Sequence, residues 1–201
     1  MVAITIQNVL YSFSITRQPK ARQKILDAAR RIVESQGAGH LTFDELAVES
    51  GVTRGGITYH FPTKEALLKG LIEVDIADWE RAAHETVPEL GCRKTAVILG
   101  HLRCNLDSED LQHRRFVSGM LSAAMIDPSL LDPVREHQRR TFDGWDWSDT
   151  DLMRYVILMA SEGMFWQSMF DMNPLPPSVH QRVVTLIRSL AENPCAMPKN
   201  A

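Results

Sequence analysis

Hydrophobic residues recur at spacings of three and four along most of the 201-residue chain, which is the period of an α-helix with one buried face. Asp, Ser, Gly and Pro interrupt this pattern at short intervals, as they do where helices end and turns begin. No stretch alternates convincingly between polar and apolar residues as a strand does. We therefore expect an all-α fold with helices over residues 20–36, 42–50, 54–61, from 63 toward 79, 93–106, 111–126, 129–142, 150–170 and 177–192.

The segment from Thr42 to Phe61 predicts two short helices joined by a tight turn. Thr42 followed by Glu45 fits a capping box, in which each side chain satisfies a backbone donor at the helix start. Gly51 stands where the first helix needs a left-handed residue to end, and Thr53 is a suitable N-cap for the second helix. Two helices joined so closely form a helix-turn-helix, whose second helix enters the major groove of DNA.

The second helix carries the polar groups that DNA recognition requires. Donors and acceptors on Arg54, Thr58, Tyr59 and His60 suit phosphate oxygens and base edges, whereas Ile57 and Phe61 are left to anchor the helix to the core.

Two adjacent glycines, Gly55 and Gly56, are unexpected in this helix because each weakens it by roughly 1 kcal/mol relative to alanine. That cost is understandable where the backbone must come close to a DNA phosphate. The alternative is that the Gly-Gly pair is a loop and that the helix starts after it.

The stretch GVTRGGITYHFPTKEALL resembles the DNA-binding region of the tetracycline-repressor (TetR) family of bacterial transcriptional regulators. In that family a hydrophobic residue, a Tyr and a Phe close the recognition helix and a Lys follows; the matching positions are Ile57, Tyr59, Phe61 and Lys64. The first helix, RQKILDAARRIVESQG, is also similar. The resemblance is specific over residues 22–71, and beyond them it is one of length and helical architecture.

The resemblance implies a ligand-responsive regulator, most often a repressor, that binds a palindromic operator in double-stranded DNA as a homodimer and is released by a small molecule. The residues it assigns to DNA contact, together with the reasoning above, are Thr42, Thr53, Arg54, Gly55, Gly56, Thr58, Tyr59, His60 and Lys64. Two alternatives remain open: a helical enzyme or carrier with a vestigial helix-turn-helix, and a constitutive DNA-binding protein without an effector.

Charge is distributed unevenly along the chain. Residues 17–69 hold nine Lys or Arg and six Asp or Glu, a net charge of +3, and residues 70–201 hold thirteen and nineteen, a net charge of −6. A basic head on an acidic body favours contact between DNA and the head. We divide the chain into an N-terminal arm expected to be disordered (1–18), a helix-turn-helix domain (19–66), a helical effector-binding and dimerisation domain (67–194) and a tail (195–201).

The last two helices are the most apolar part of the body. The helix over 150–170 is apolar on several faces, and the one over 177–192 has a clean stripe at helical spacing. Similar final helices in the TetR family build a four-helix bundle between subunits, so the expected dimer interface comprises Tyr155, Val183, Leu186, Ile187 and Leu190. The alternative is that these helices pack within one chain.

Met and aromatic residues are frequent in the body, and in the TetR family a small-molecule pocket lies among the body helices. The expected lining is Phe116, Met120, Met159, Glu162, Phe165 and Trp166, although each apolar residue alone fits a core position better. Glu162 interrupts an apolar helix, which places it either near a polar group of the pocket or in a hydrogen bond at the interface.

Other kinds of chemistry find little support in the sequence. His101 and Cys104 lie three apart on one helix, but a metal site needs two more ligands, so neither metal nor cofactor is expected. We find no catalytic motif and expect no enzyme. Three cysteines without C-x-x-C spacing, no charged leader and no long apolar run favour a cytoplasmic protein with no membrane span.

Overall fold

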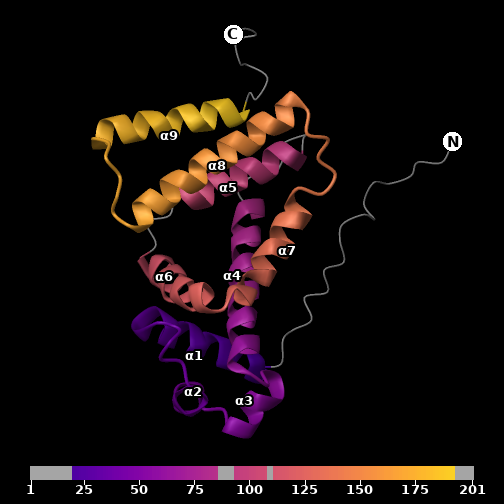
Figure 1. Ribbon diagram of the computed structural model, residues 1–201, viewed down its shortest axis with the longest axis vertical. Helices are drawn as coiled ribbons and strands as arrows, with labels where there is room; N and C mark the ends of the chain where they lie inside the picture. Colours follow the sequence, from indigo (N-terminus) through magenta and orange to yellow (C-terminus); the bar gives the residue numbers. More distant parts are fainter. Residues whose placement is uncertain (1–19, 86–92, 108–110, 193–201) are drawn as a thin grey trace, which may run out of the picture.

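The computed structural model describes residues 20–85, 93–107 and 111–192. These residues contain no strand, which confirms the expected all-α fold. Helices α1 to α3 form a head at one end, α4 runs from the head into the body, and the remaining helices build the body (Figure 1). The elements are α1 (Lys20–Gln36), α2 (Phe43–Ser50), α3 (Arg54–His60), α4 (Lys64–Glu85), α5 (Arg93–Asp107), α6 (Leu111–Ile126), the 3-10 helix η2 (Pro128–Leu131), α7 (Asp132–Thr141), α8 (Asp149–Met169) and α9 (Pro177–Glu192).

The single helix predicted over residues 129–142 is wrong, because the structure divides it into η2 and α7. The Asp127 carboxylate accepts a hydrogen bond from Ser129 N at 3.0 Å and caps η2. Pro133 then lies in the first turn of α7. A proline is tolerated in a first turn but not in a helix interior, where its ring clashes with the preceding turn, so the helix restarts at Asp132.

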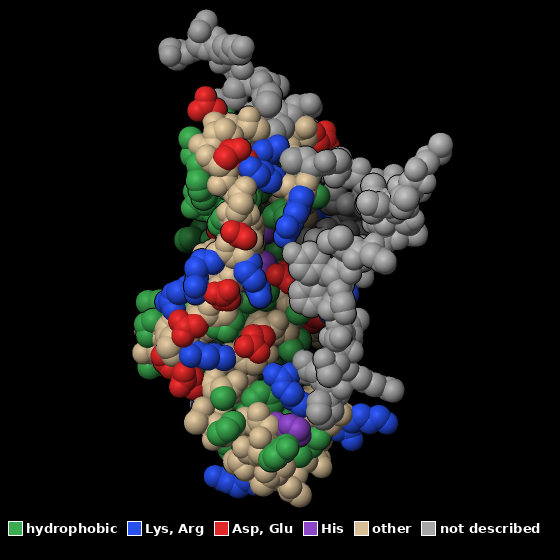
Figure 2. Space-filling model, turned by 90° about the vertical axis from the view of Figure 1, so that its right-hand side faces the viewer, with side chains coloured by type: hydrophobic (Ala, Val, Ile, Leu, Met, Phe, Trp, Pro, Cys, Tyr) green, Lys and Arg blue, Asp and Glu red, His purple; other side chains and the backbone are tan. Residues whose placement is uncertain are grey.

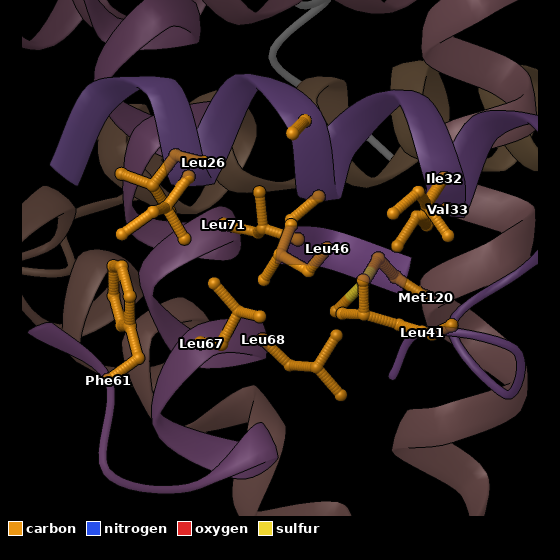
Figure 3. Close-up of a cluster of buried hydrophobic side chains, with 14 of the residues drawn as sticks. Leu26, Ile32, Val33, Leu41, Leu46, Phe61, Leu67, Leu68, Leu71 and Met120 are labelled. Carbon is orange, nitrogen blue, oxygen red and sulfur yellow. The ribbon is translucent and has the colours of Figure 1, made fainter. Parts of the chain in front are cut away.

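The core of the head is a cluster of apolar side chains from α1, α2, α3 and α4 that point toward one another (Figure 3). Burial of one such side chain stabilises the fold by about 1.5–3 kcal/mol. The cluster does not end at the head, since Phe116 and Met120 of α6 are buried in it as well. Head and body therefore share one core, formed around Leu26, Leu46, Phe61, Leu67 and Leu71.

Helix α6 lies directly against the C-terminal part of α1. Ala38 N donates a hydrogen bond to Gly119 O at 3.4 Å, and a Cβ atom at position 119 would lie only 2.9 Å from Val33 O. Only glycine permits so close an approach of two backbones. A displacement of α6 must consequently be transmitted to α1.

A second core lies in the body, where α5, α8 and α9 meet. Its buried centre is made of aliphatic side chains from all three helices, with Trp145 from the segment between α7 and α8. Helix α8 is central to this core, which explains why its sequence is apolar on more than one face. The aliphatic members are Ile98, Leu102, Ile157, Leu158 and Ile187.

Several predictions concern residues outside the described part. The arm over 1–18, the tail over 195–201, Cys92 and Cys195 all lie there. Between the expected DNA-binding and effector domains, α4 passes residues 66 and 67 without a break. None of the described helices combines the length and the apolar character needed to cross a membrane.

Candidate functional site

The turn between α2 and α3 is set by short-range hydrogen bonds at the predicted positions. Thr42 Oγ1 accepts from Glu45 N at 3.2 Å, and Thr53 Oγ1 accepts from Gly56 N at 3.2 Å. Gly51 adopts the left-handed conformation, with φ of 66°. Both predicted N-caps and the predicted C-cap are confirmed, and together they fix the direction in which α3 leaves α2.

The reciprocal half of the predicted capping box is not formed. The Glu45 carboxylate instead accepts a hydrogen bond from Gln36 Nε2 at 2.8 Å. The side chain therefore ties the start of α2 to the last residue of α1, which orients the helix-turn-helix on the rest of the head.

Helix α3 presents its polar residues to solvent and its apolar residues to the core. Ile57 and Phe61 are buried, as predicted, whereas the Tyr59 side chain is 83% exposed and its ring meets the half-buried His60 ring at 5.1 Å. Such an exposed tyrosine at the tip of a short helix contributes little to the stability of the head. Its apolar ring and its hydroxyl are available for a partner.

Arg54 and Thr58 are already engaged in the free protein. Exposed Arg54 forms an ion pair with Asp44 at the start of α2. The Thr58 hydroxyl donates to the carbonyl oxygens of Arg54 and Gly55, both at 3.1 Å. DNA contact through Arg54 therefore requires the guanidinium to exchange or share its carboxylate partner, while the Thr58 hydroxyl keeps acceptor capacity.

The two glycines of α3 differ in their surroundings. A Cβ atom on Gly56 would lie 2.9 Å from Val52 Cγ1, so packing inside the helix-turn-helix accounts for this glycine. A Cβ atom on Gly55 would meet nothing within 4 Å, and Gly55 is exposed. Nothing inside the described head requires glycine at position 55.

The remaining predicted contacts surround α3. Thr42 and Thr53 are exposed at the N-terminal ends of α2 and α3. Lys64 Nζ donates to Gly39 O at 3.0 Å and so ties the start of α4 to the loop after α1. On the face shown in Figure 2, Lys and Arg side chains lie at the margins of the lower end of the molecule, where the head is, and also on the body.

A cavity of about 340 Å³ lies in the body between α4, α5, α6, α7 and α8. Five of the six residues predicted for a pocket line it: Phe116, Met120, Glu162, Phe165 and Trp166. Met159 does not, because its side chain packs against the second core. The lining from α4, α5 and α7 was not predicted, and it includes Asp75, Trp79, His101 and His137.

The polar lining groups have distinct environments. Burial, with a smaller effect of neighbouring His137, lowers the pKa of His101 to about 3, so this ring is uncharged at neutral pH. Its ring meets that of Trp79 edge-to-face at 4.0 Å. Burial raises the pKa of Glu162. His101 and Cys104 both line the cavity, but nowhere in the described residues do three His, Cys, Asp or Glu side chains gather as a metal site requires.

One cavity wall is in contact with the DNA-binding head. Arg30 of α1 donates to Asp75 at 3.0 Å and lies over the Phe116 ring, 4.3 Å from its centroid. Burial opposes the charge of this guanidinium, but Asp75 and Glu34 outweigh it and raise the pKa of Arg30. Both Asp75 and Phe116 line the cavity, so a molecule inside it would contact two partners of a head residue.

Four of the five residues predicted for the dimer interface contact the second core of their own subunit. Ile187 is buried in the second core, and Tyr155, Val183 and Leu190 pack against that core. Leu186 is exposed. The stripe on α9 therefore takes part in packing within one chain, and its role in a dimer interface stays a prediction. The large apolar side chains exposed on α8 and α9 are Leu152, Val156, Trp166 and Leu186, and Phe170 follows at the end of α8.

Comparison with known proteins identifies both parts of the chain. Residues 25–71 match the model of the bacterial regulatory proteins of the tetR family, and residues 95–192 match that of the tetracyclin repressor-like C-terminal domain. The crystal structure of the putative transcriptional regulator SCO7518 from Streptomyces coelicolor A3(2) shares the fold with a TM-score of 0.64 at 17% identity, over 85% of this chain and 99% of that one.

Two of the relatives with similar sequences illustrate the extent of the match. The HTH-type transcriptional regulator SrpR of Pseudomonas putida is 38% identical over 53 residues, which are 26% of this chain and 25% of that protein. The HTH-type transcriptional regulator LmrA of Bacillus subtilis is 31% identical over 134 residues, 62% of this chain and 66% of the relative. The matched segment thus spans less than two thirds of either relative. With both family models matched in order along one all-α chain, the protein belongs to the tetracycline-repressor family of bacterial regulatory proteins.

Proposed function

We propose that the protein is a transcriptional repressor that binds a palindromic operator as a homodimer and is released by a small molecule in the body cavity. The exposed face of α3 carries this proposal. It combines the exposed ring of Tyr59, the exposed side chain of Arg54 and a glycine at position 55 that no contact inside the described head requires. A recognition helix that lies close to DNA accounts for all three.

Release by a ligand requires that the ligand bind the DNA-incompetent conformation better than the DNA-bound one. The contact of Arg30 with Asp75 and Phe116 supports a direct route for this coupling. A ligand that moves the Phe116 ring, or that competes with Arg30 for Asp75, changes the position of α1 relative to the body. The shared backbone contact between α6 and α1 at Gly119 passes on the same displacement.

We infer a regulatory rather than a catalytic role, exercised in the cytoplasm where bacterial DNA lies. Family membership and the contact between cavity and head support this inference. Two residues of the cavity wall, Asp75 and Phe116, contact Arg30 of the head, an arrangement suited to regulation of that head by a ligand.

Selection of bound sequences from a random duplex pool, at two salt concentrations, tests the proposed function. We expect a palindrome whose half-sites are about one helical turn, roughly 34–36 Å, apart. Affinity for it should fall as salt rises, because phosphate contacts release counterions. Recovery of no motif at either salt concentration would contradict the proposal.

The dimer is expected to form through the exposed apolar face of α8 and α9, and Val156 tests this prediction because its side chain is 58% exposed on α8. Val156→Glu should place a charge inside the interface and convert the dimer to a folded monomer, since an unpaired charge is costly to bury. Sedimentation equilibrium measures the change. Val48→Glu, on an exposed residue of α2, is the matched control and should remain dimeric. Dimeric Val156→Glu protein would exclude this face as the interface.

A further inference from the structure

We propose that the body cavity binds an aromatic organic cation and that the Glu162 carboxylate is its counter-ion. The inference rests on the proposed function, because it assigns the chemical class of the effector.

The charges around the cavity favour a cation over an anion. The described lining residues include Asp75 and Glu162 but neither Lys nor Arg. Asp75 already has Arg30 as its partner at 3.0 Å. An anionic ligand, such as a carboxylate or a phosphate ester, would meet no formal cation among these residues and would face an unneutralised carboxylate at Glu162.

The histidines of the lining do not reverse this balance. His101 is uncharged at neutral pH because burial lowers its pKa to about 3. His113 Nδ1 lies 3.5 Å from Asp75, and His137 Nδ1 lies 2.8 Å from Glu80. Each of the other two rings therefore already faces a carboxylate. Glu162 is left as the acidic lining group without a counter-ion.

Glu162 is placed to receive a ligand group. Within the described residues it makes neither a hydrogen bond nor an ion pair, although its side chain is half-buried. Burial of a carboxylate without a partner disfavours its charged form, and the raised pKa of Glu162 has this origin. A cation in the cavity would pair with the Glu162 carboxylate and offset the cost of burying its charge. Part of the binding free energy would therefore come from stabilising the charged form of Glu162.

Aromatic rings supply the second half of the recognition. Trp79, Phe116, Phe165 and Trp166 line the same cavity as Glu162. The rings of Phe165 and Trp166, three and four residues after Glu162 on α8, meet edge-to-face at 5.3 Å. Ring faces attract cations and stack on flat aromatic groups. The volume of about 340 Å³ suits a ligand of several rings, larger than a simple amine.

The closing experiment compares two probes of nearly equal size and opposite charge, tetraphenylphosphonium and tetraphenylborate. Isothermal titration calorimetry on the full chain without DNA gives the ratio of their affinities. We expect the cation to bind about tenfold or more tightly than the anion. In Glu162→Gln, which keeps the shape and removes the charge, the ratio should fall by about the same factor.

Glu73→Gln is the matched control, since Glu73 is exposed on α4 and loses the same charge outside the cavity. The ratio of its affinities for the two probes should equal that of the unmodified protein. Tighter binding of the anion, absent binding of the cation, or equal effects of the two substitutions would each overturn the inference. Operator binding without ligand is measured in parallel. If the protein binds its operator but shows no preference for the cation, the proposed ligand class is wrong and the regulatory function stands. If it prefers the cation but does not bind an operator, the proposed regulatory function is wrong and the ligand class stands.

Discussion

Gly55→Ala is expected to stabilise the free protein while weakening operator binding by about tenfold or more, a loss of about 1.4 kcal/mol. The added methyl group would meet nothing within 4 Å in the free protein. Alanine is favoured over glycine in helices by up to about 1 kcal/mol, and it also restricts the unfolded chain. Stability should therefore rise. If the backbone at position 55 lies against a phosphate, the same methyl group holds the recognition helix away from DNA.

Gly56→Ala is the matched control because it makes the same change one residue further along α3. There the methyl group would lie 2.9 Å from Val52 Cγ1, so the Val52 side chain in the turn between α2 and α3 has to shift. We expect this variant to lose stability and to lose operator affinity as a consequence. The two alanines should thus move the free energy of unfolding in opposite directions.

Urea denaturation and fluorescence anisotropy with the selected operator distinguish the two variants. A Gly55→Ala protein that is more stable and binds DNA poorly locates the defect at the interface with DNA. One that is equally or more stable and binds with full affinity would show that the α3 backbone does not approach DNA closely at this point.

The helix-turn-helix could be predicted almost residue by residue because its signals are local. Thr42 and Thr53 cap helices that start within three residues of them, and Gly51 is left-handed in its own backbone. Such interactions depend on neighbours in the sequence. The break at Pro133 is a local signal as well, because a proline is tolerated in the first turn of a helix and not in its interior.

Interactions between distant segments could not be predicted in the same way. The stripe on α9 shows which side chains share a face, and it does not say whether that face meets α8 of the same chain or of a second copy. Ile187 illustrates the ambiguity, since it is buried within the subunit. Asp75 of α4 and His137 of α7 both line the cavity, although no motif in the sequence connects them.

The role of Arg30 could not be predicted either, because its contacts come from residues that are distant in the sequence. Nothing in the sequence of the first helix distinguishes Arg30 from the other charged residues there. In the structure the side chain is half-buried between the carboxylate of Asp75 and the ring of Phe116. Its role depends on tertiary packing alone. Because Asp75 and Phe116 also line the cavity, a ligand that moves them would also move Arg30 and α1.

Asp151→Asn is expected to cause the largest loss of stability, about 3–5 kcal/mol, because it breaks a buried charge network while leaving the cationic partners in place. Asp151 in α8 is 1% exposed. Its carboxylate accepts hydrogen bonds from Lys94 Nζ at 2.6 Å, from Arg154 Nη1 at 2.8 Å and from Asp146 N at 3.1 Å. These donors belong to α5, α8 and the segment between α7 and α8, which this one carboxylate holds together.

The free energy of unfolding from urea titrations measures this effect, and Asp149→Asn provides its control. Asp149 is exposed in the first turn of the same helix, so its removal should cost no more than about 1 kcal/mol through the helix dipole. Equal losses of unfolding free energy in the two variants would mean that negative charge at the start of α8, and not the buried network, stabilises the fold. A selective loss in Asp151→Asn should also weaken the dimer. The network fixes the start of the helix that carries Leu152 and Val156, so the exposed apolar face loses its shape when this end of α8 is released.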